Sequence, residues 1–192
     1  MKRISIRERR TFFRPFPLFC LLLTLALTPA QATDTDTLVG KELAPFQVTA
    51  FDGSMVRSED FAGKVWVVDF WATWCQPCLN AMPALQELYD HYDGKVEFLM
   101  LNTGWNDSLL RARGLIQKNG YTFPTAFDTT QKLAKELGIF KIPTTLVIDA
   151  SGTVRFRHEG FGSVTEVSEN LRAEIDSLLE ATEGAPAESQ TR

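Results

Sequence analysis

The stretch that decides the fold reads Val65-Trp66-Val67-Val68-Asp69-Phe70-Trp71-Ala72-Thr73-Trp74-Cys75-Gln76-Pro77-Cys78. Its first half is apolar on both alternating faces, which predicts a central β-strand buried on both sides. Its second half predicts the start of an α-helix, because Pro77 suits a first helical turn, where no N–H is needed. Two cysteines therefore lie where a buried strand gives way to a helix.

A cysteine pair at this place suits disulfide exchange. The first helical turn carries unpaired N–H groups and a partial positive charge, which stabilise a thiolate at Cys75. The thiolate is the attacking species in disulfide exchange, and Cys78 lies within reach to resolve a mixed disulfide. A purely structural bridge is the alternative, although one so short constrains little chain entropy. Zinc would need more ligands than His91 and His158 supply, and haem attachment needs a histidine where Leu79 stands.

Two further features point to this centre. Asp69 shares a face of the predicted strand with Val67 and Trp71, so we expect it to be buried, where desolvation raises a carboxyl pKa and suits a proton shuttle. The alternative is an acid satisfied by backbone N–H groups. Pro143 precedes a predicted strand, and the Ile142–Pro143 bond can be cis; an ordinary trans proline at a strand start is the alternative.

Strands and helices alternate along the rest of the chain, which predicts a mixed sheet with helices on both faces. We expect Asp128 to cap a short helix that runs through Leu137 and is stopped by Gly138. We also expect Pro83 to interrupt the helix after the cysteines, and Ser163 with Glu166 to form a capping box. The predicted strands are 46–51, 65–71, 96–101, 144–148 and 154–158, and the predicted helices cover 76–92, a segment ending near 120, a segment ending at 137, and a last helix from about 163.

The ends of the chain are predicted to lie outside the folded domain. Residues 1–32 combine a basic start, an apolar run over 16–27 and Ala30-Gln31-Ala32, the order found in a cleavable signal peptide. The alternative is an uncleaved anchor, and Arg9-Arg10 also matches a twin-arginine signal loosely. Residues 33–37 read as a polar linker, 38–180 as one domain, and 181–192 as a disordered tail.

Charge excludes one class of partner. The whole chain carries a net charge of −4, of which residues 1–32 contribute +5, so the remainder carries −9. Proteins that bind nucleic acid need basic patches, so we expect no nucleic-acid partner. The two histidines have no supporting neighbours in the sequence and are expected on the surface. We expect no metal site and no cofactor beyond a redox-active Cys75–Cys78 disulfide.

The segment 71–78 resembles the W-x-x-W-C-x-P-C motif of TlpA/ResA-like thioredoxin-fold reductases. The resemblance covers nearly all of residues 38–180 and implies an α/β thioredoxin-like fold with Cys75 as the nucleophile and Cys78 as the resolving thiol. It implies that Pro143 is a cis-proline against the disulfide. Further positions that carry the resemblance are Gly40, Leu43 to Phe46, Gly63-Lys64, Phe123-Pro124, Asp128, Ile142 to Thr145, Asp149, Gly152 and Gly160.

The family resemblance also implies partners. We expect a monomeric periplasmic reductase that takes electrons from a membrane thiol carrier and reduces client proteins, with a place in cytochrome c maturation. Client contacts are expected from Trp74, Gln76, Pro77, Ile142 and Thr144, alongside the catalytic group of Cys75, Cys78, Asp69 and Pro143.

Two positions depart from the family pattern, and two other functions are compatible with parts of the sequence. Ala81 stands where many members carry a glutamate, whereas Asp69 matches the buried acid of thioredoxin. Met100 stands where thioredoxin has a lysine. The alternative functions are a thiol peroxidase, since the opening Gly40-x-x-Leu43-Ala44-Pro45-Phe46 resembles that of peroxiredoxins, and a chaperone-like binding module with a structural disulfide.

Overall fold

Strand β3 (Val65–Trp71) forms the centre of the structure, a computed structural model that describes residues 38–160 and 162–183. All seven of its residues are buried. Strand β4 (Val96–Asn102) pairs with it in parallel, and β6 (Thr144–Ile148) pairs antiparallel along its other edge. A strand enclosed at both edges and on both faces must be apolar almost throughout, as predicted from the sequence.

The sheet is mixed, as predicted. Within the described residues it has seven strands in the order β2-β1-β5-β4-β3-β6-β7. The pairs β3–β4 and β4–β5 are parallel and the other four are antiparallel. The outer strands are β1 (Gln47–Ala50), β2 (Met55–Arg57), β5 (Thr125–Phe127) and β7 (Val154–Glu159).

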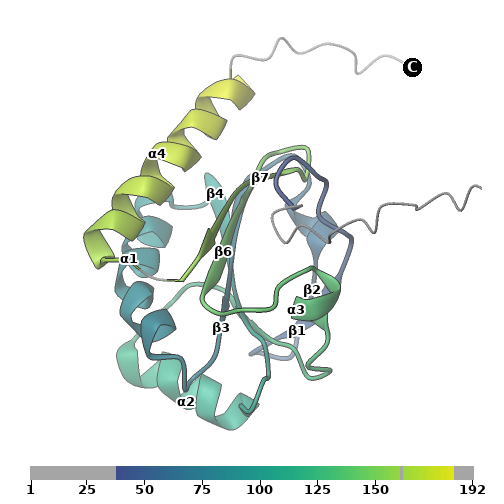
Figure 1. Cartoon of the computed structure of the whole chain (residues 1–192), viewed down its shortest axis with the longest axis vertical. Helices are drawn as coiled ribbons and strands as arrows, with labels where there is room; N and C mark the ends of the chain where they lie inside the picture. Colours follow the sequence, from purple (N-terminus) through teal and green to yellow (C-terminus); the bar gives the residue numbers. More distant parts are fainter. Residues whose placement is uncertain (1–37, 161, 184–192) are drawn as a thin grey trace, which may run out of the picture. The chain divides into compact units, whose positions relative to one another are not determined.

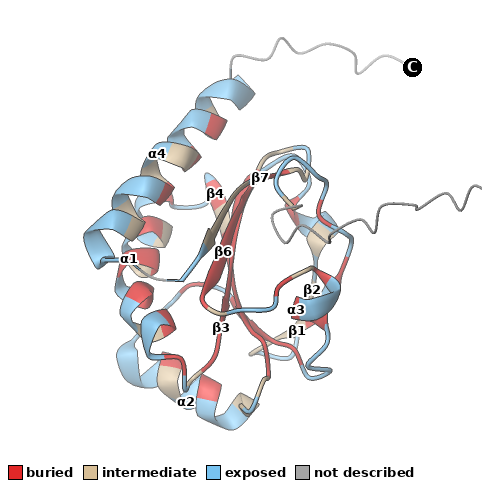
Figure 2. Cartoon of the chain, in the orientation of Figure 1, coloured by how far each residue is buried: buried red, intermediate tan, exposed pale blue. Residues whose placement is uncertain are grey.

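Helices cover both faces of the sheet (Figure 1). One face carries α1 (Gln76–Tyr92), α2 (Leu109–Asn119) and α4 (Val164–Glu183). The other carries α3 (Leu133–Glu136) and a 3-10 turn over Ser58–Phe61. Figure 2 shows that burial is concentrated in the central strands and in the helix sides that face them. The predicted α/β fold class is therefore confirmed.

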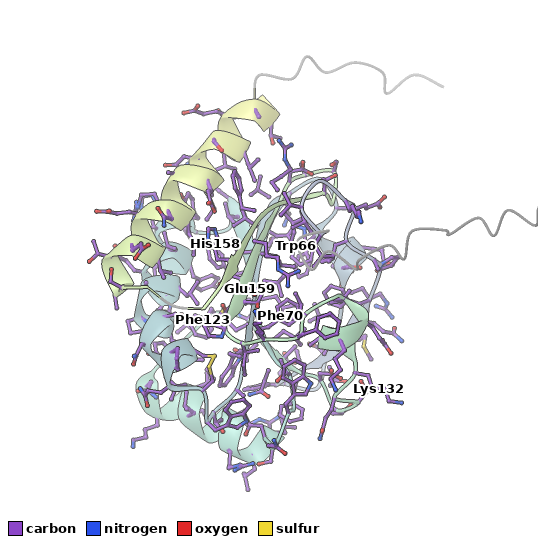
Figure 3. All side chains as sticks on the ribbon, viewed as in Figure 1. Trp66, Phe70, Phe123, Lys132, His158 and Glu159 are labelled. Carbon is purple, nitrogen blue, oxygen red and sulfur yellow. A yellow bond between two sulfur atoms is a disulfide. The ribbon has the colours of Figure 1, made fainter. Side chains whose placement is uncertain are left out.

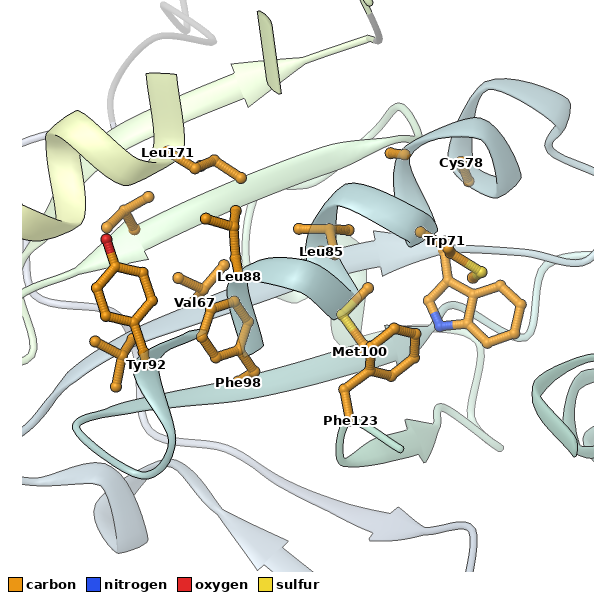
Figure 4. Packing of buried hydrophobic residues seen from close by; sticks show 14 of the residues in the cluster. Val67, Trp71, Cys78, Leu85, Leu88, Tyr92, Phe98, Met100, Phe123 and Leu171 are labelled. Atoms are coloured by element: carbon orange, nitrogen blue, oxygen red, sulfur yellow. The ribbon is translucent and has the colours of Figure 1, made fainter. Parts of the chain in front are cut away.

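The two faces of β3 belong to two separate apolar clusters. Val67 and Trp71 pack with Leu85 and Leu88 of α1, in a cluster that also contains Cys78 (Figure 4). The second cluster, on the opposite face, takes the alternate residues of β3, which are Trp66, Val68 and Phe70. The cysteine pair is thus part of the larger core, and the helix that carries it is held by apolar packing along its length.

The structure corrects several local predictions. Strands β2 and β5 were not predicted, because three residues are too short to establish an alternating pattern. Helix α1 runs without a break across Pro83, so the predicted interruption is wrong; the proline is exposed and its ring lies on the solvent side. Helix α3 has only four residues, and its N-cap residue is Lys132 rather than Asp128.

Asp128 nevertheless accepts hydrogen bonds from backbone N–H groups at and before the start of α3, although it is not the N-cap residue. Its carboxylate accepts hydrogen bonds from the backbone N–H groups of Thr130, Gln131 and Leu133, at 3.0, 3.0 and 2.8 Å. At the last helix, Ser163 Oγ accepts from Glu166 N at 3.1 Å, which is the first half of the predicted capping box.

The domain boundary at residue 180 is set too early. Helix α4 continues to Glu183, so residues 181–183 belong to the fold rather than to a disordered tail. The predicted signal peptide, the linker and the rest of the tail lie outside the described residues. No described helix combines the length and the apolar character needed to cross a membrane.

Candidate active site

Cys75 and Cys78 form a disulfide at the start of α1. Cys75 is the N-cap residue, and its Sγ accepts a hydrogen bond from Cys78 N at 3.3 Å. Cys75 is 4% exposed and Cys78 is fully buried, so only the first sulfur borders the surface. The order of accessibility agrees with the predicted roles of nucleophile and resolving thiol.

The geometry favours a thiolate at Cys75 once the disulfide is reduced. An N-cap sulfur faces the unpaired N–H groups of the first helical turn and the positive end of the helix dipole. Cys78 N already points to it, and Pro77 in the first turn leaves one fewer N–H to satisfy. Such surroundings stabilise a cysteine thiolate.

Asp69 is buried in the middle of β3, on the face that carries the cysteines. It is 1% exposed, its Oδ1 accepts from Thr145 Oγ1 at 2.7 Å, and its Oδ2 has no hydrogen-bond partner among the described residues. Met100 lies beside it in register on β4, so that side offers no positive charge. Desolvation outweighs the Thr145 hydrogen bond and raises the pKa of Asp69 to about 7. The expected burial is confirmed, and backbone N–H groups do not satisfy the acid.

The Ile142–Pro143 peptide bond is cis, as expected from the family resemblance. Strand β6 begins directly after it, antiparallel to β3, with Thr144 in register with Phe70. The start of β6 therefore lies at the same end of the sheet as the C-terminal end of β3. The redox loop, which leads from β3 to Cys75, begins there. Thr144 is fully buried and its hydroxyl donates to the Lys141 carbonyl, so its side chain lies away from the surface where a client would bind.

Trp74 is the exposed aromatic residue beside the disulfide. Its side chain is oriented by a hydrogen bond from its indole N–H to the Trp105 carbonyl, and it remains 51% exposed. The Trp105 indole in turn donates to the Gln131 carbonyl at 3.2 Å. Gln76 is exposed, and its amide donates to Asn80 at 2.9 Å. Trp74 and Gln76 thus lie on the surface next to the redox pair, as their predicted contact role requires.

Asp107 is a site residue that sequence reasoning missed. Its side chain is fully buried, and its carboxylate accepts from Thr73 N and Thr73 Oγ1, both at 2.7 Å. Asn102 Nδ2 and Ser108 N also donate to it, at 2.9 and 2.8 Å. Thr73 precedes Trp74 and Cys75, so Asp107 ties the loop after β4 to the redox loop. The Asp-Ser pair before α2 signals only a helix cap in sequence.

The surroundings of His158 differ from the prediction. It is not an unsupported surface histidine, because its Nε2 lies 2.8 Å from Glu174 Oε2 and its side chain is 36% exposed. In Figure 3 it lies on the α4 side of β7. His91 is exposed, as predicted, and packs edge-on against Tyr92. Within residues 38–160 and 162–183, no cluster of His, Cys, Asp and Glu side chains has the arrangement of a metal site.

Replacing Asp107 by asparagine is expected to lower the free energy of unfolding by about 1–3 kcal/mol, because hydrogen bonds to an ionised group are lost. Burial by itself would raise the pKa of Asp107, but the hydrogen bonds from Thr73, Asn102 and Ser108 outweigh it and lower the pKa. The stabilisation is therefore present at neutral pH and is lost as pH falls through the folded-state pKa. Urea unfolding at several pH values measures this, with Asp90→Asn on the exposed face of α1 as control. An Asp107→Asn penalty that persists unchanged in acid would contradict it.

Asp69→Asn is expected to have the opposite sign. Between the ordinary carboxyl pKa of 3.8 and about 7, the unfolded chain ionises Asp69 while the folded protein keeps it protonated, so wild-type stability falls as pH rises. The variant has no such group and should be more stable than wild type at pH 8, by roughly 1–4 kcal/mol. The two proteins should converge near pH 4. Parallel stability curves for the two proteins from pH 4 to 8 would show that Asp69 does not ionise in this window.

Comparison with known proteins agrees with this centre. The AhpC/TSA family matches residues 39–157. Thiol-disulfide oxidoreductase ResA of Bacillus thuringiensis (strain Al Hakam) is 33% identical over 153 residues, which cover 78% of this chain and 87% of that protein. A putative thiol:disulfide interchange protein DsbE from Chlorobium tepidum has a similar structure, with 26% identity, a TM-score of 0.66, and coverage of 73% of this chain and 97% of that one. StoA from Bacillus subtilis is similar at 25% identity and a TM-score of 0.56, with coverage of 66% and 95%. The chain therefore belongs to the AhpC/TSA family and is a thiol-disulfide oxidoreductase with a thioredoxin-like fold.

Proposed function

We propose that this protein is an exported reductase of protein disulfides. The observation that carries the proposal is the placement of a redox disulfide on a helix N-terminus with a buried acid, Asp69, on the same side of the sheet and no cation beside it on β4. The first feature activates a nucleophile, and the second supplies a proton acceptor with a pKa close to working pH.

The reaction begins from the dithiol form. The Cys75 thiolate attacks one sulfur of a client disulfide, so that a Cys75–client bond forms and the client S–S bond breaks. The thiol of Cys78 then loses its proton to the Asp69 carboxylate and attacks Cys75 Sγ. The Cys75–Cys78 disulfide forms, the client leaves with two reduced sulfurs, and the protein has given up two electrons. Asp69 and Cys78 titrate as a coupled pair during this step.

A membrane thiol carrier would return the electrons, and no other cofactor is needed. The basic and apolar segment of residues 1–32 supports export to the periplasm. One client class in accord with the family resemblance is apocytochrome c, whose C-x-x-C-H cysteines must be reduced before haem attachment. The acidic chain disfavours nucleic acid as a partner.

Clients would dock over the exposed surface around Cys75. Trp74 offers a large apolar face there, and Gln76 and Pro77 lie at the start of α1 beside it. Ile142 and the cis-proline Pro143 directly precede β6, which begins beside the C-terminal end of β3. The backbone before Thr144, rather than its buried side chain, would complete this contact.

Replacing either cysteine by serine separates reductase function from the alternatives. We expect Cys75→Ser to lose insulin reduction completely, because no nucleophile remains. Cys78→Ser should accumulate a mixed disulfide, since the resolving thiol is absent. A chaperone-like module would keep its holding activity in both variants. Consumption of hydroperoxide by the wild type, faster than reduction of insulin, would favour the thiol peroxidase instead.

Export gives a separate prediction. Cleavage after Ala32 should leave a mature chain that begins at Thr33 and holds two of the three cysteines, because Cys20 is removed. The intact mass of the protein purified from the periplasmic fraction gives the cleavage position. The increase in mass on alkylation of the reduced protein gives the number of cysteines. A membrane-bound chain that retains residues 1–32 and three thiols would identify an uncleaved anchor.

A further inference from the structure

A buried proton acceptor needs a route to solvent. Asp69 must release in each catalytic cycle the proton that it takes from Cys78, yet it is 1% exposed. Among the described residues its one hydrogen-bond partner is the hydroxyl of Thr145, at 2.7 Å. Thr145 can both donate and accept a hydrogen bond, so its hydroxyl can serve as the first member of such a route.

Three side chains lie in one row across the sheet. Asp69 of β3 is directly opposite Thr145 of β6, and Thr145 is directly opposite His158 of β7. Residues paired in this way point to the same face, with Cβ atoms about 4.5–5.5 Å apart. The row leads from the core towards the edge strand, and His158 at its outer end is 36% exposed.

A cavity of about 470 Å³ connects the outer two members of the row. Its lining includes Thr145, His158, Pro143, Asn170 and Ala81. A polar cavity of this size accommodates water. The Thr145 hydroxyl thus lies between the buried acid on one side and a hydrated space on the other.

Glu174 of α4 determines which imidazole nitrogen of His158 carries the hydrogen. An ionised carboxylate can only accept a hydrogen bond, so Nε2 carries the hydrogen in this pair and Nδ1 is the nitrogen free to take a proton. Figure 3 shows His158 on the side of β7 that faces α4. Imidazole is the side chain that most readily exchanges protons near neutral pH.

The other charged groups around the row are few. Glu166 lines the cavity from α4, and Glu174 of the same helix pairs with His158. Arg157 and Glu159 pair with each other on β7, and the Arg157 side chain reaches the Gly138 carbonyl. Arg157 and Glu159 also line the cavity, and Arg157, which is in register with Leu146, directs its side chain to the opposite face of the sheet from Asp69. Helix α1 contributes the neutral Ala81, and β4 contributes Met100 beside Asp69.

We propose that Thr145 and His158 form a proton relay that connects Asp69 to solvent, which rests on the proposed proton role of Asp69. Protonated Asp69 passes its hydrogen to Thr145 Oγ1 while the hydroxyl hydrogen of Thr145 moves to water in the cavity. That water passes a proton to His158 Nδ1, and the imidazolium releases it to solvent. One proton enters from Cys78 and one leaves at His158, and the relay residues are unchanged. The reverse path delivers a proton when the disulfide is reduced.

The test measures the decay of a mixed disulfide. The reduced full-length protein is mixed with glutathione disulfide in weak buffer, and the Cys75–glutathione adduct is followed by acid quench and mass spectrometry. Thr145→Val and His158→Gln are expected to slow adduct decay about tenfold or more, since positioned proton transfer contributes at least this much. Thr145→Ser should retain the wild-type rate, and His91→Gln is the matched histidine control.

Added imidazole distinguishes a relay from a structural role. It should restore the rate of His158→Gln and leave wild type unchanged, because a soluble buffer replaces a missing proton carrier but does not repair a fold. In an Asp69→Asn background, His158→Gln should slow decay no further, as members of one path are not additive. A wild-type rate for His158→Gln in weak buffer, a slow rate that imidazole does not raise, or additivity with Asp69→Asn would each overturn the relay.

The same proteins separate this inference from the proposed function. If Asp69→Asn decays at the wild-type rate, the proton role of Asp69 fails and the relay fails with it. If the variants behave as expected with glutathione disulfide but wild type does not reduce insulin, the relay holds and the proposed reductase function is wrong. Thr145 is buried on β6, so circular dichroism checks the Thr145→Val fold; the half-exposed His158 provides the independent variant.

Discussion

The structure depends on the enclosure of β3. This strand is bonded to a neighbour at each edge and covered by an apolar cluster on each face, so it is cut off from water on every side. Enclosure fixes its register and the direction in which it delivers the chain to the redox loop. It also gives the single carboxyl group within it, Asp69, an environment in which ionisation is costly. The stability of the fold and the reactivity of the site therefore have the same physical origin.

Two kinds of contact hold the redox loop at the end of this strand. Helix α1 is anchored along its length by Leu85 and Leu88 in the core, which fixes the direction of its N-terminus. The loop before it is anchored by Asp107, whose buried carboxylate takes both polar hydrogens of Thr73. The helix supplies the field that stabilises a thiolate, and the polar clamp fixes where the sulfur lies in that field. Neither contact could replace the other, because apolar packing has no directional preference.

The charge arrangement around the cysteines is asymmetric. On the exposed side, the helix N-terminus favours negative charge on Cys75. On the buried side, Asp69 has no cation beside it on β4 and one hydroxyl partner, so its pKa is raised to about 7 and both protonation states are accessible near neutral pH. The outer sulfur is thus suited to attack, while the inner one is suited to proton transfer. Ala81 leaves space on the same side of the sheet, next to the row of Thr145 and His158.

The sequence by itself determined the fold class, the buried strand, the redox pair and the burial of Asp69, because these follow from local periodicity and from the residue types within one continuous segment. It did not reveal β2 and β5, which are too short to show a pattern and form only because a neighbouring strand is available for pairing. Asp107 and His158 also escaped it, since each acquires its partner across a distance in sequence: Thr73 is 34 residues from Asp107, and Glu174 is 16 residues from His158. The helix boundary at Glu183 and the continuity of α1 across Pro83 were likewise decided by packing and exposure rather than by propensity. Tertiary structure alone could bring Asp69, Thr145 and His158 into one row, because register between strands depends on which edges and faces are buried in the complete sheet.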